Sequence, residues 1–116
     1  MTVQAYFHGG PAGLAEILPP SVTATPSSAD CGAERVCRRD RVYLTTSAEA
    51  ARVFALFAPC KGSVAVYEVL PIGDVLPDPD CVEPGLSVEC ERAHVVRVFE
   101  RIKPKRRASL LARVSA

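Results

Sequence analysis

The order of strand-like and helix-like segments constrains the fold of this chain more than any other feature. Segments with the alternation or β-branched composition of strands lie at residues 3–8, 41–44, 62–71 and 93–102. Segments with helical composition lie at residues 11–18, 48–58 and 105–114. Strands and helices are mixed without a regular βαβ rhythm, since no helix separates the strands at 62–71 and 93–102, and parallel sheets are built from such a rhythm. We therefore predict an α+β fold with an antiparallel-rich sheet and a few short helices.

Prolines and polar caps mark the expected ends of the helices. Pro19 and Pro20 should close the first helical segment and Pro59 the second, because proline cannot continue a helix. Thr46 and Glu49 have the spacing of a capping box, in which each side chain accepts a hydrogen bond from a free backbone N–H.

Composition and loop signals complete this outline of the fold. Ala, Val, Phe and Leu fill most of residues 48–58, so this helix is expected to be largely buried. Residues 21–40 and the Pro- and Asp-rich residues 72–85 should be surface loops, since both lack apolar periodicity.

The length of 116 residues fits one compact domain, residues 1–116, and the 48% of hydrophobic residues suffices for a core. No apolar run approaches the roughly 20 residues that span a bilayer. The N-terminus lacks the basic and then apolar pattern of a signal peptide. We expect a cytoplasmic protein that does not insert into a membrane.

The cysteines favour reduced thiols over a disulfide framework or a metal site. Their number is odd, their spacing is irregular, and no C-x-x-C pair occurs beside the two histidines. Cys31 and Cys37 flank a charged stretch and could pair in an oxidised protein. The five cysteines are Cys31, Cys37, Cys60, Cys81 and Cys90.

Charge is unevenly distributed along a chain whose formal net charge is only +1. Residues 97–113 carry a net +6, and residues 68–91 hold seven acids and no base. A basic C-terminal helix or tail (103–116) can bind nucleic acid or an acidic partner, or it can be a solvated helix face. The absence of interleaved aromatic residues favours the solvated face, because base stacking requires aromatic rings.

Three short motifs follow one another along the chain. His8, Gly9 and Gly10 end the first predicted strand, Tyr43 precedes the second helix, and Asp78 lies in the acidic loop. In this order "YFHGG", "VYLTTSAEAARVFA" and "YEVLPIGDVLPDPD" resemble the small mono-ADP-ribosyltransferases of the rifamycin-modifying type, in the diphtheria-toxin-like His-Tyr-acid class. The later "PGLSVECERAHVVRV" is similar to the closing strand of that family, so the resemblance covers most of the chain.

The resemblance implies a compact ADP-ribosyltransferase-like fold with a split β-sheet. It also implies an enzyme that cleaves NAD, its co-substrate, between nicotinamide and ribose without a metal ion. ADP-ribose would pass to an acceptor that is a small molecule, a protein or nucleic acid. The implied catalytic residues are His8, Tyr43 and Asp78. The implied NAD-binding residues are His8, Gly9, Tyr43, Thr45 and Ser47.

These residue types suit the chemistry of NAD cleavage. Nicotinamide leaves as a neutral molecule, so the reaction needs electrostatic support for an oxocarbenium-like ribose, which a carboxylate such as Asp78 supplies. His8 would hydrogen-bond ribose hydroxyls, Gly9 would leave its backbone open to the carboxamide, and Tyr43 would stack on the nicotinamide ring. The wider class uses glutamate, so other acids stay open as the catalytic group: Asp74, Asp80, Glu83, Glu89 and Glu91.

Two other functions are consistent with the same motifs. A catalytically inactive relative would bind a nucleotide or a partner in the cleft, and an NAD glycohydrolase would use water as the acceptor. Each motif alone also has a structural explanation: a histidine before a glycine turn, an aromatic residue in a sheet, an aspartate in a proline turn. The order of the three motifs favours the transferase.

Overall fold

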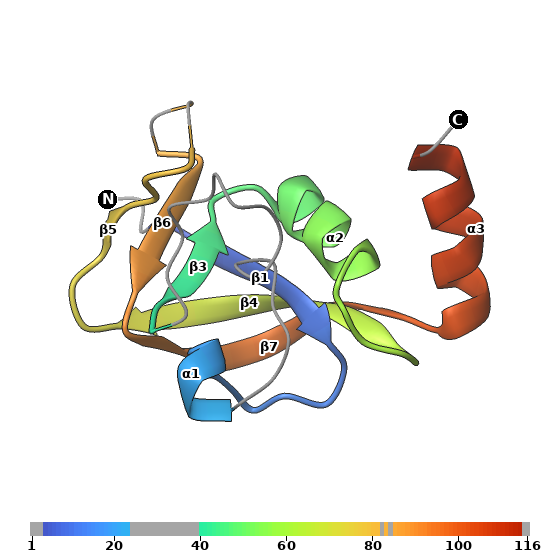
Figure 1. Cartoon of the computed structure of the whole chain (residues 1–116), viewed down its shortest axis with the longest axis horizontal. Coiled ribbons are helices and arrows are strands. Elements are labelled where there is room, and N and C mark those ends of the chain that lie inside the picture. The colour runs from blue at the N-terminus through green and yellow to red at the C-terminus, as the bar shows by residue number, and fades with distance from the viewer. Residues whose placement is uncertain (1–3, 24–39, 82, 84, 115–116) are drawn as a thin grey trace.

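Two antiparallel neighbours, β4 (Val64–Ile72) and β7 (Arg92–Ile102), are the longest strands of the sheet (Figure 1). The computed structural model describes residues 4–23, 40–81, 83 and 85–114. Within these residues the sheet has seven strands in the order β2-β7-β4-β1-β3-β6-β5, and every neighbouring pair is antiparallel. The other strands are β1 (Tyr6–Pro11), β2 (Glu16–Ile17), β3 (Val42–Thr45), β5 (Leu76–Pro77) and β6 (Ser87–Cys90), and the helices are α1 (Pro20–Thr23), α2 (Ala48–Leu56) and α3 (Pro104–Val114).

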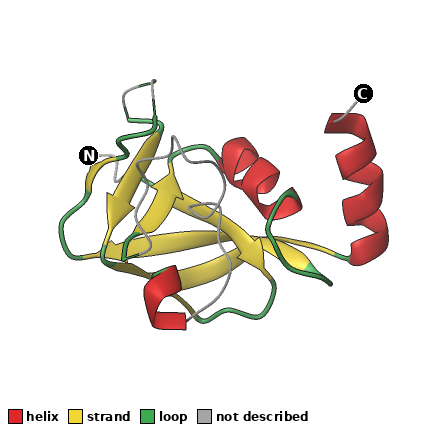
Figure 2. Cartoon of the chain, viewed as in Figure 1, coloured by secondary structure: helices red, strands yellow, loops and turns green. Residues whose placement is uncertain are grey.

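The predicted α+β class, with an antiparallel sheet and a few short helices, is confirmed (Figure 2). The strands expected at 3–8, 41–44, 62–71 and 93–102 correspond to β1, β3, β4 and β7. The helices expected near 48–58 and 105–114 correspond to α2 and α3. None of the helices in the described ranges is long and apolar enough to cross a membrane.

The helix predicted at residues 11–18 is wrong. Gly13, with a φ of 89°, turns the chain there, and the two residues of β2 then pair with the start of β7. The phenol of Tyr67 holds this turn, because its hydroxyl donates to the carbonyl of Pro11 and accepts from the backbone N–H of Leu14. Long-range pairing and a buried tyrosine therefore override the local helical composition.

Helix starts also differ from the predicted ones. Pro20 begins α1 instead of closing a helix, because the first helical position needs no backbone N–H. The N-cap of α2 is Ser47, whose Oγ accepts from the N–H of Ala50 at 3.1 Å. The predicted capping box of Thr46 and Glu49 is therefore wrong.

The expected loops are only partly described. Of the predicted loop at 21–40, residues 21–23 belong to α1. Residues 24–39, which include Cys31 and Cys37, lie outside the described residues. The 72–85 segment contains the two-residue strand β5, which pairs with β6. The expected loop is therefore interrupted by a short edge strand.

Alternate residues of β4 enter two separate cores. Val64 and Val66 pack with Ala51, Ala55 and Leu56 of α2 and with Ile102, whereas Ala65, Tyr67 and Val69 belong to the second cluster. The helix α2 buries only three of its residues, and Val53 and Phe54 are exposed, as is Phe57 directly after the helix. The prediction that this helix is largely buried is therefore wrong.

One weak joint divides the sheet into two parts. Strand β1 pairs with β4 along six residues but with β3 only at Phe7 and Thr45. The group β2-β7-β4-β1 and the group β3-β6-β5 therefore meet at a single cross-strand pair (Figure 1). His8 and Tyr43 lie at this joint.

Candidate functional site

The joint brings the ring of His8 to the backbone of Tyr43. Nδ1 of this half-buried histidine lies 3.1 Å from the carbonyl oxygen of Tyr43. A carbonyl only accepts, so Nδ1 carries the proton and Nε2 of the neutral ring is an acceptor. Burial lowers the pKa of His8 below its ordinary value of 6.5, and the hydrogen bond to Tyr43 opposes this shift.

Tyr43 connects His8 to a buried carboxylate. The pairing of β3 with β6 places Tyr43 opposite Glu89, and the phenol hydroxyl donates to Oε2 of Glu89 at 3.0 Å. Glu89 is only 6% exposed, so its carboxylate depends on polar partners such as this hydroxyl. His8, Tyr43 and Glu89 thus form a continuous series of contacts across three adjacent strands.

A pocket of about 290 Å³ begins at the next cross-strand pair on the same face beyond Tyr43 and Glu89, and His8, Tyr43 and Glu89 are not among its lining residues. Thr45 and Ser87 line it, and they form the cross-strand pair two residues along from Tyr43 and Glu89, on the same face of the sheet. Phe54 of α2 also lines the pocket, with half of its surface exposed. The other lining residues are Ala50, Asp78, Asp80, Cys81, Glu83 and Leu86.

Asp78 is held in the pocket by a turn that orients its carboxylate. Oδ1 accepts from the backbone N–H of Asp80 at 2.8 Å, and Oδ2 accepts from the hydroxyl of Ser87 at 2.7 Å. The first contact is an Asx turn, the structural role that aspartate often has beside proline. Asp80 and Glu83 line the same pocket, so its electrostatic field favours a cation.

The acids weighed from the sequence are therefore separated by the fold. Asp78, Asp80 and Glu83 line the pocket. Glu89 is buried, accepts a hydrogen bond from the Tyr43 hydroxyl and is not a lining residue. Asp74 and Glu91 are exposed and are not among its lining residues.

Gly9 serves the packing of helix α2 on strand β1. A Cβ atom at this position would lie 1.9 Å from the carbonyl oxygen of Ala51 and 2.6 Å from the backbone nitrogen of Ala55. The helix can approach the strand this closely only because residue 9 has no side chain. This packing is sufficient to require glycine at position 9, and the contact of its backbone groups with the nicotinamide carboxamide stays a prediction.

Thr45 and Ser47 use their side chains to hold the start of α2. The hydroxyl of Thr45 donates to the carbonyl of Leu86 at 2.8 Å and accepts from the N–H of Ser47 at 3.1 Å. Ser47 in turn caps the helix. Of these two predicted NAD-binding residues, Thr45 lines the pocket, and the contact of either with NAD stays a prediction.

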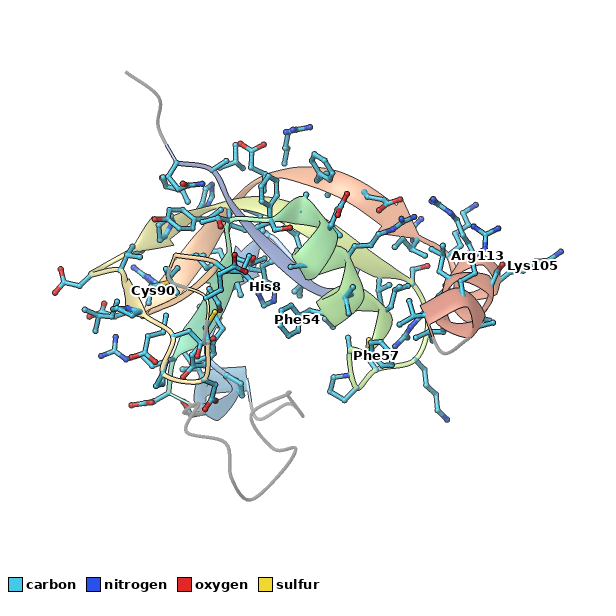
Figure 3. The ribbon with its side chains drawn as sticks, turned by 90° about the horizontal axis from the view of Figure 1, so that it is seen from above. His8, Phe54, Phe57, Cys90, Lys105 and Arg113 are labelled. Atoms are coloured by element: carbon cyan, nitrogen blue, oxygen red, sulfur yellow. The ribbon has the colours of Figure 1, made fainter. Side chains whose placement is uncertain are left out.

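Phe54 is the pocket residue that the sequence-based prediction missed. Figure 3 shows its ring projecting from α2 on the side of β1 where the His8 ring lies. At 100° per residue, Val53, Phe54 and Leu56 cannot all lie on one helix stripe, so at least one had to be exposed. That pattern signals an exposed apolar residue on this helix without identifying Phe54 as the exposed one.

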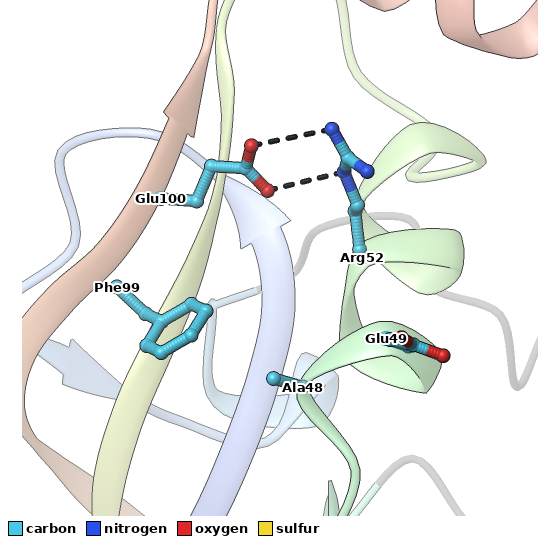
Figure 4. Close-up of a pocket in the computed structure, with 5 residues that line it drawn as sticks. All are labelled: Ala48, Glu49, Arg52, Phe99 and Glu100. Atoms are coloured by element: carbon cyan, nitrogen blue, oxygen red, sulfur yellow. Dashed lines mark hydrogen bonds and ion pairs between the residues drawn. The ribbon is translucent and has the colours of Figure 1, made fainter.

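A larger pocket of about 490 Å³ is a weaker candidate (Figure 4). Its lining includes Arg52 and Glu100, whose side chains meet with Nε–Oε1 at 3.1 Å. These charges neutralise each other, and none of the sequence-predicted site residues lines this pocket. The other lining residues are Ala48, Glu49 and Phe99.

Comparison with known proteins adds no assignment, because the chain matches no family model and no curated protein. Within the described ranges, no three side chains of the types that bind metals lie close enough together to hold an ion. The candidate site is therefore characterised by its own geometry and charge.

Proposed function

We propose that this protein is an NAD-dependent ADP-ribosyltransferase, which cleaves the bond between nicotinamide and ribose and passes ADP-ribose to an acceptor. One observation carries the proposal. Tyr43 contacts both His8 and Glu89, and the Tyr43–Glu89 pair neighbours the Thr45–Ser87 pair that lines an acidic pocket with an exposed aromatic ring. The antiparallel sheet with its weak β1–β3 joint supports assignment of the split-sheet fold of these enzymes.

The pocket suits the nicotinamide end of NAD. The nicotinamide ring of NAD is cationic, and Phe54 offers it an aromatic face that attracts a cation. When the bond to ribose breaks, both bonding electrons leave with nicotinamide and the positive charge moves to the ribose. Asp78 stabilises that charge from a fixed position, and Asp80 and Glu83 add to the negative field.

His8 and Tyr43 position the ribose. The proton on Nδ1 of His8 is directed to the Tyr43 carbonyl, so Nε2 accepts a hydrogen bond from a ribose hydroxyl. The lowered pKa of His8 keeps the ring neutral at physiological pH. The bond from the Tyr43 hydroxyl to buried Glu89 fixes the orientation of the ring that would stack on nicotinamide, and Phe54 offers a second aromatic face in the pocket.

The acceptor completes the reaction. Its nucleophilic atom forms a bond to C1′ of the ribose and loses a proton, and water in this role gives NAD hydrolysis. The pocket does not select among a small molecule, a protein and nucleic acid.

One observation favours a second candidate, an inactive nucleotide-binding module. Both carboxylate oxygens of Asp78 already accept hydrogen bonds within the fold, as they do in an aspartate that only stabilises a turn. Such a protein binds NAD in the same pocket and releases no nicotinamide.

The test measures NAD affinity and nicotinamide release for the wild type, His8→Ala and Phe54→Ala. We expect each variant to weaken NAD binding about tenfold, which corresponds to about 1.4 kcal/mol. The matched controls His94→Ala and Val53→Ala, both at exposed positions, should behave as the wild type. Binding without release supports the inactive module, and unchanged affinity in both site variants contradicts the proposed pocket.

A further inference from the structure

The C-terminal end of the molecule carries a basic surface that NAD cleavage does not use. Residues 101–114 include six basic residues and no acid. One of them, Arg107, points inward and donates to the carbonyls of Leu56 (3.1 Å), Ala58 (2.7 Å) and Cys60 (2.7 Å). This contact fastens α3 to the end of α2 and leaves the other basic side chains in solvent.

We call the exposed basic side chains on α3 and directly before it, together with Lys61, the basic patch, whereas Arg101 lies on the other face of the sheet. Lys61 belongs to it, because Arg107 of α3 holds the carbonyl of the preceding residue. Among the described residues, Arg106 of this set pairs with Glu100 at 3.1 Å, and the other members form no ion pair. The basic patch consists of Lys61, Lys103, Lys105, Arg106 and Arg113.

The basic patch lies apart from the candidate site. Figure 3 shows Lys105 and Arg113 projecting from α3 at the end of the molecule distant from His8. Acidic residues concentrate in 68–91, in and around β5 and β6, which lie at the opposite end of the molecule in Figure 1. Because the acidic and basic regions are far apart, the electrostatic potential around α3 is positive although the net charge of the chain is only +1.

The chemistry of this surface identifies the kind of partner. Between its charges α3 exposes only small residues, Ala108, Ser109 and Ala112. Protein interfaces have aromatic and apolar centres and are depleted in lysine, so an acidic protein is a poor fit. Single-stranded nucleic acid needs stacking aromatics, which the helix lacks. Regularly spaced phosphates on a duplex require only cations and close approach.

We propose that the basic patch binds the phosphate backbone of double-stranded nucleic acid without reading its sequence. The 11 residues of α3 span about 16 Å, which equals the rise of about five base pairs along the duplex axis at about 3.4 Å each. This binding is independent of the proposed NAD chemistry, and its assay contains no NAD.

The experiment measures fluorescence anisotropy of a labelled duplex of about 20 base pairs at increasing salt. About four phosphate contacts predict a slope of log K against log salt near −3.6, or about a 100-fold loss of affinity between 50 and 200 mM salt. Lys105→Gln with Arg113→Gln should reduce the magnitude of this slope by about 1.8. Arg92→Gln with Arg97→Gln removes the same charge from exposed positions on β7 and should leave the slope unchanged.

Three results would overturn the proposal. The first is absence of duplex binding at 50 mM salt. The second is an equal loss in the patch variant and the β7 control, which would mean that net charge alone governs binding. The third is tighter binding of a single strand or of polyglutamate than of the duplex, since either would assign the patch to another class of partner.

Discussion

At the scale of single residues, the two ring nitrogens of His8 have different roles. Nδ1 is directed to the Tyr43 carbonyl, and Nε2 is the acceptor available to a ligand. Because burial lowers the pKa of His8 below 6.5, the unfolded chain takes up a proton at a higher pH than the folded chain. The contribution of His8 to stability is therefore complete above pH 6.5 and is lost as the pH falls from 6.5 toward the lowered pKa.

Urea unfolding at about pH 8 and about pH 5 tests this behaviour of His8. The wild type should lose more unfolding free energy between the two pH values than His8→Gln, which has no titrating ring. His94→Gln removes the only other histidine and serves as the control. An identical loss in the wild type and His8→Gln would contradict the assigned pKa shift.

Tyr43→Phe tests the contact between the phenol and buried Glu89. Removing the hydroxyl takes a donor from a carboxylate that is only 6% exposed, so we expect a loss of about 1–2 kcal/mol in unfolding free energy. Tyr6→Phe, at another half-buried tyrosine, should cost much less. Equal effects of the two substitutions would mean that the Tyr43–Glu89 contact contributes little.

The residues of the candidate site differ in how far the sequence predicts them. The order of the motifs and the family resemblance that it carries single out His8 and Tyr43. In the fold, the His8 ring contacts the backbone carbonyl of Tyr43. The exposure of Phe54 could not be predicted, because it depends on which side of α2 packs against Gly9. That packing is a tertiary contact that local composition does not encode.

At the scale of elements, Gly9 controls the docking of α2 on β1. Gly9→Ala places a Cβ 1.9 Å from the Ala51 carbonyl, so the helix must shift and the protein should lose about 3 kcal/mol or more of unfolding free energy. Gly10→Ala is the control, since its Cβ would meet only the His8 ring at 3.3 Å. Chemical denaturation of both variants measures the difference, and a Gly9→Ala protein as stable as Gly10→Ala would refute the packing role.

Arg107 is expected to determine whether α3 stays attached. Arg107→Met removes three hydrogen bonds to backbone carbonyls while retaining an aliphatic side chain. The packing of Leu110 and Leu111 and the ion pair of Arg106 with Glu100 then remain to hold α3. Hydrogen exchange of the α3 amides should accelerate at least about tenfold, because local opening becomes easier. Arg113→Met, at an exposed position, should leave this exchange unchanged.

In strand β7, the alternation of residues does not predict which side chains are buried. Alternation in this segment puts Val96 and Val98 on one face and Val95 and Phe99 on the other. Register shifts against β4 insert Val96 and Phe99 as extra residues, and Val96, Val98 and Phe99 are all exposed. Bulges depend on the partner strand, so the sequence predicts this strand but not which side chains it buries.

At the scale of the whole molecule, the order of elements was sufficient to predict the α+β class. It could not predict the two-part sheet, because within the described residues the backbone pairing of the two parts is limited to Phe7 and Thr45, which lie far apart in the chain. At that joint His8 contacts the Tyr43 carbonyl, and the acidic pocket begins at the cross-strand pair of Thr45 and Ser87. The pocket and the basic patch are separate surfaces, so substitutions in one should leave the other unaffected.

Nicotinamide release from NAD, measured side by side for the wild type, Asp78→Asn and Asp74→Asn, tests the central claim most directly. We expect release by the wild type and by Asp74→Asn, whose exposed carboxylate lies outside the pocket lining. Asp78→Asn should lose about 100-fold or more in kcat with little change in NAD affinity, because its charge acts mainly in the transition state. A fully active Asp78→Asn beside an inactive Glu89→Gln would move the catalytic role to the buried glutamate. No release by the wild type, with no NAD-dependent change in Tm, would contradict the account.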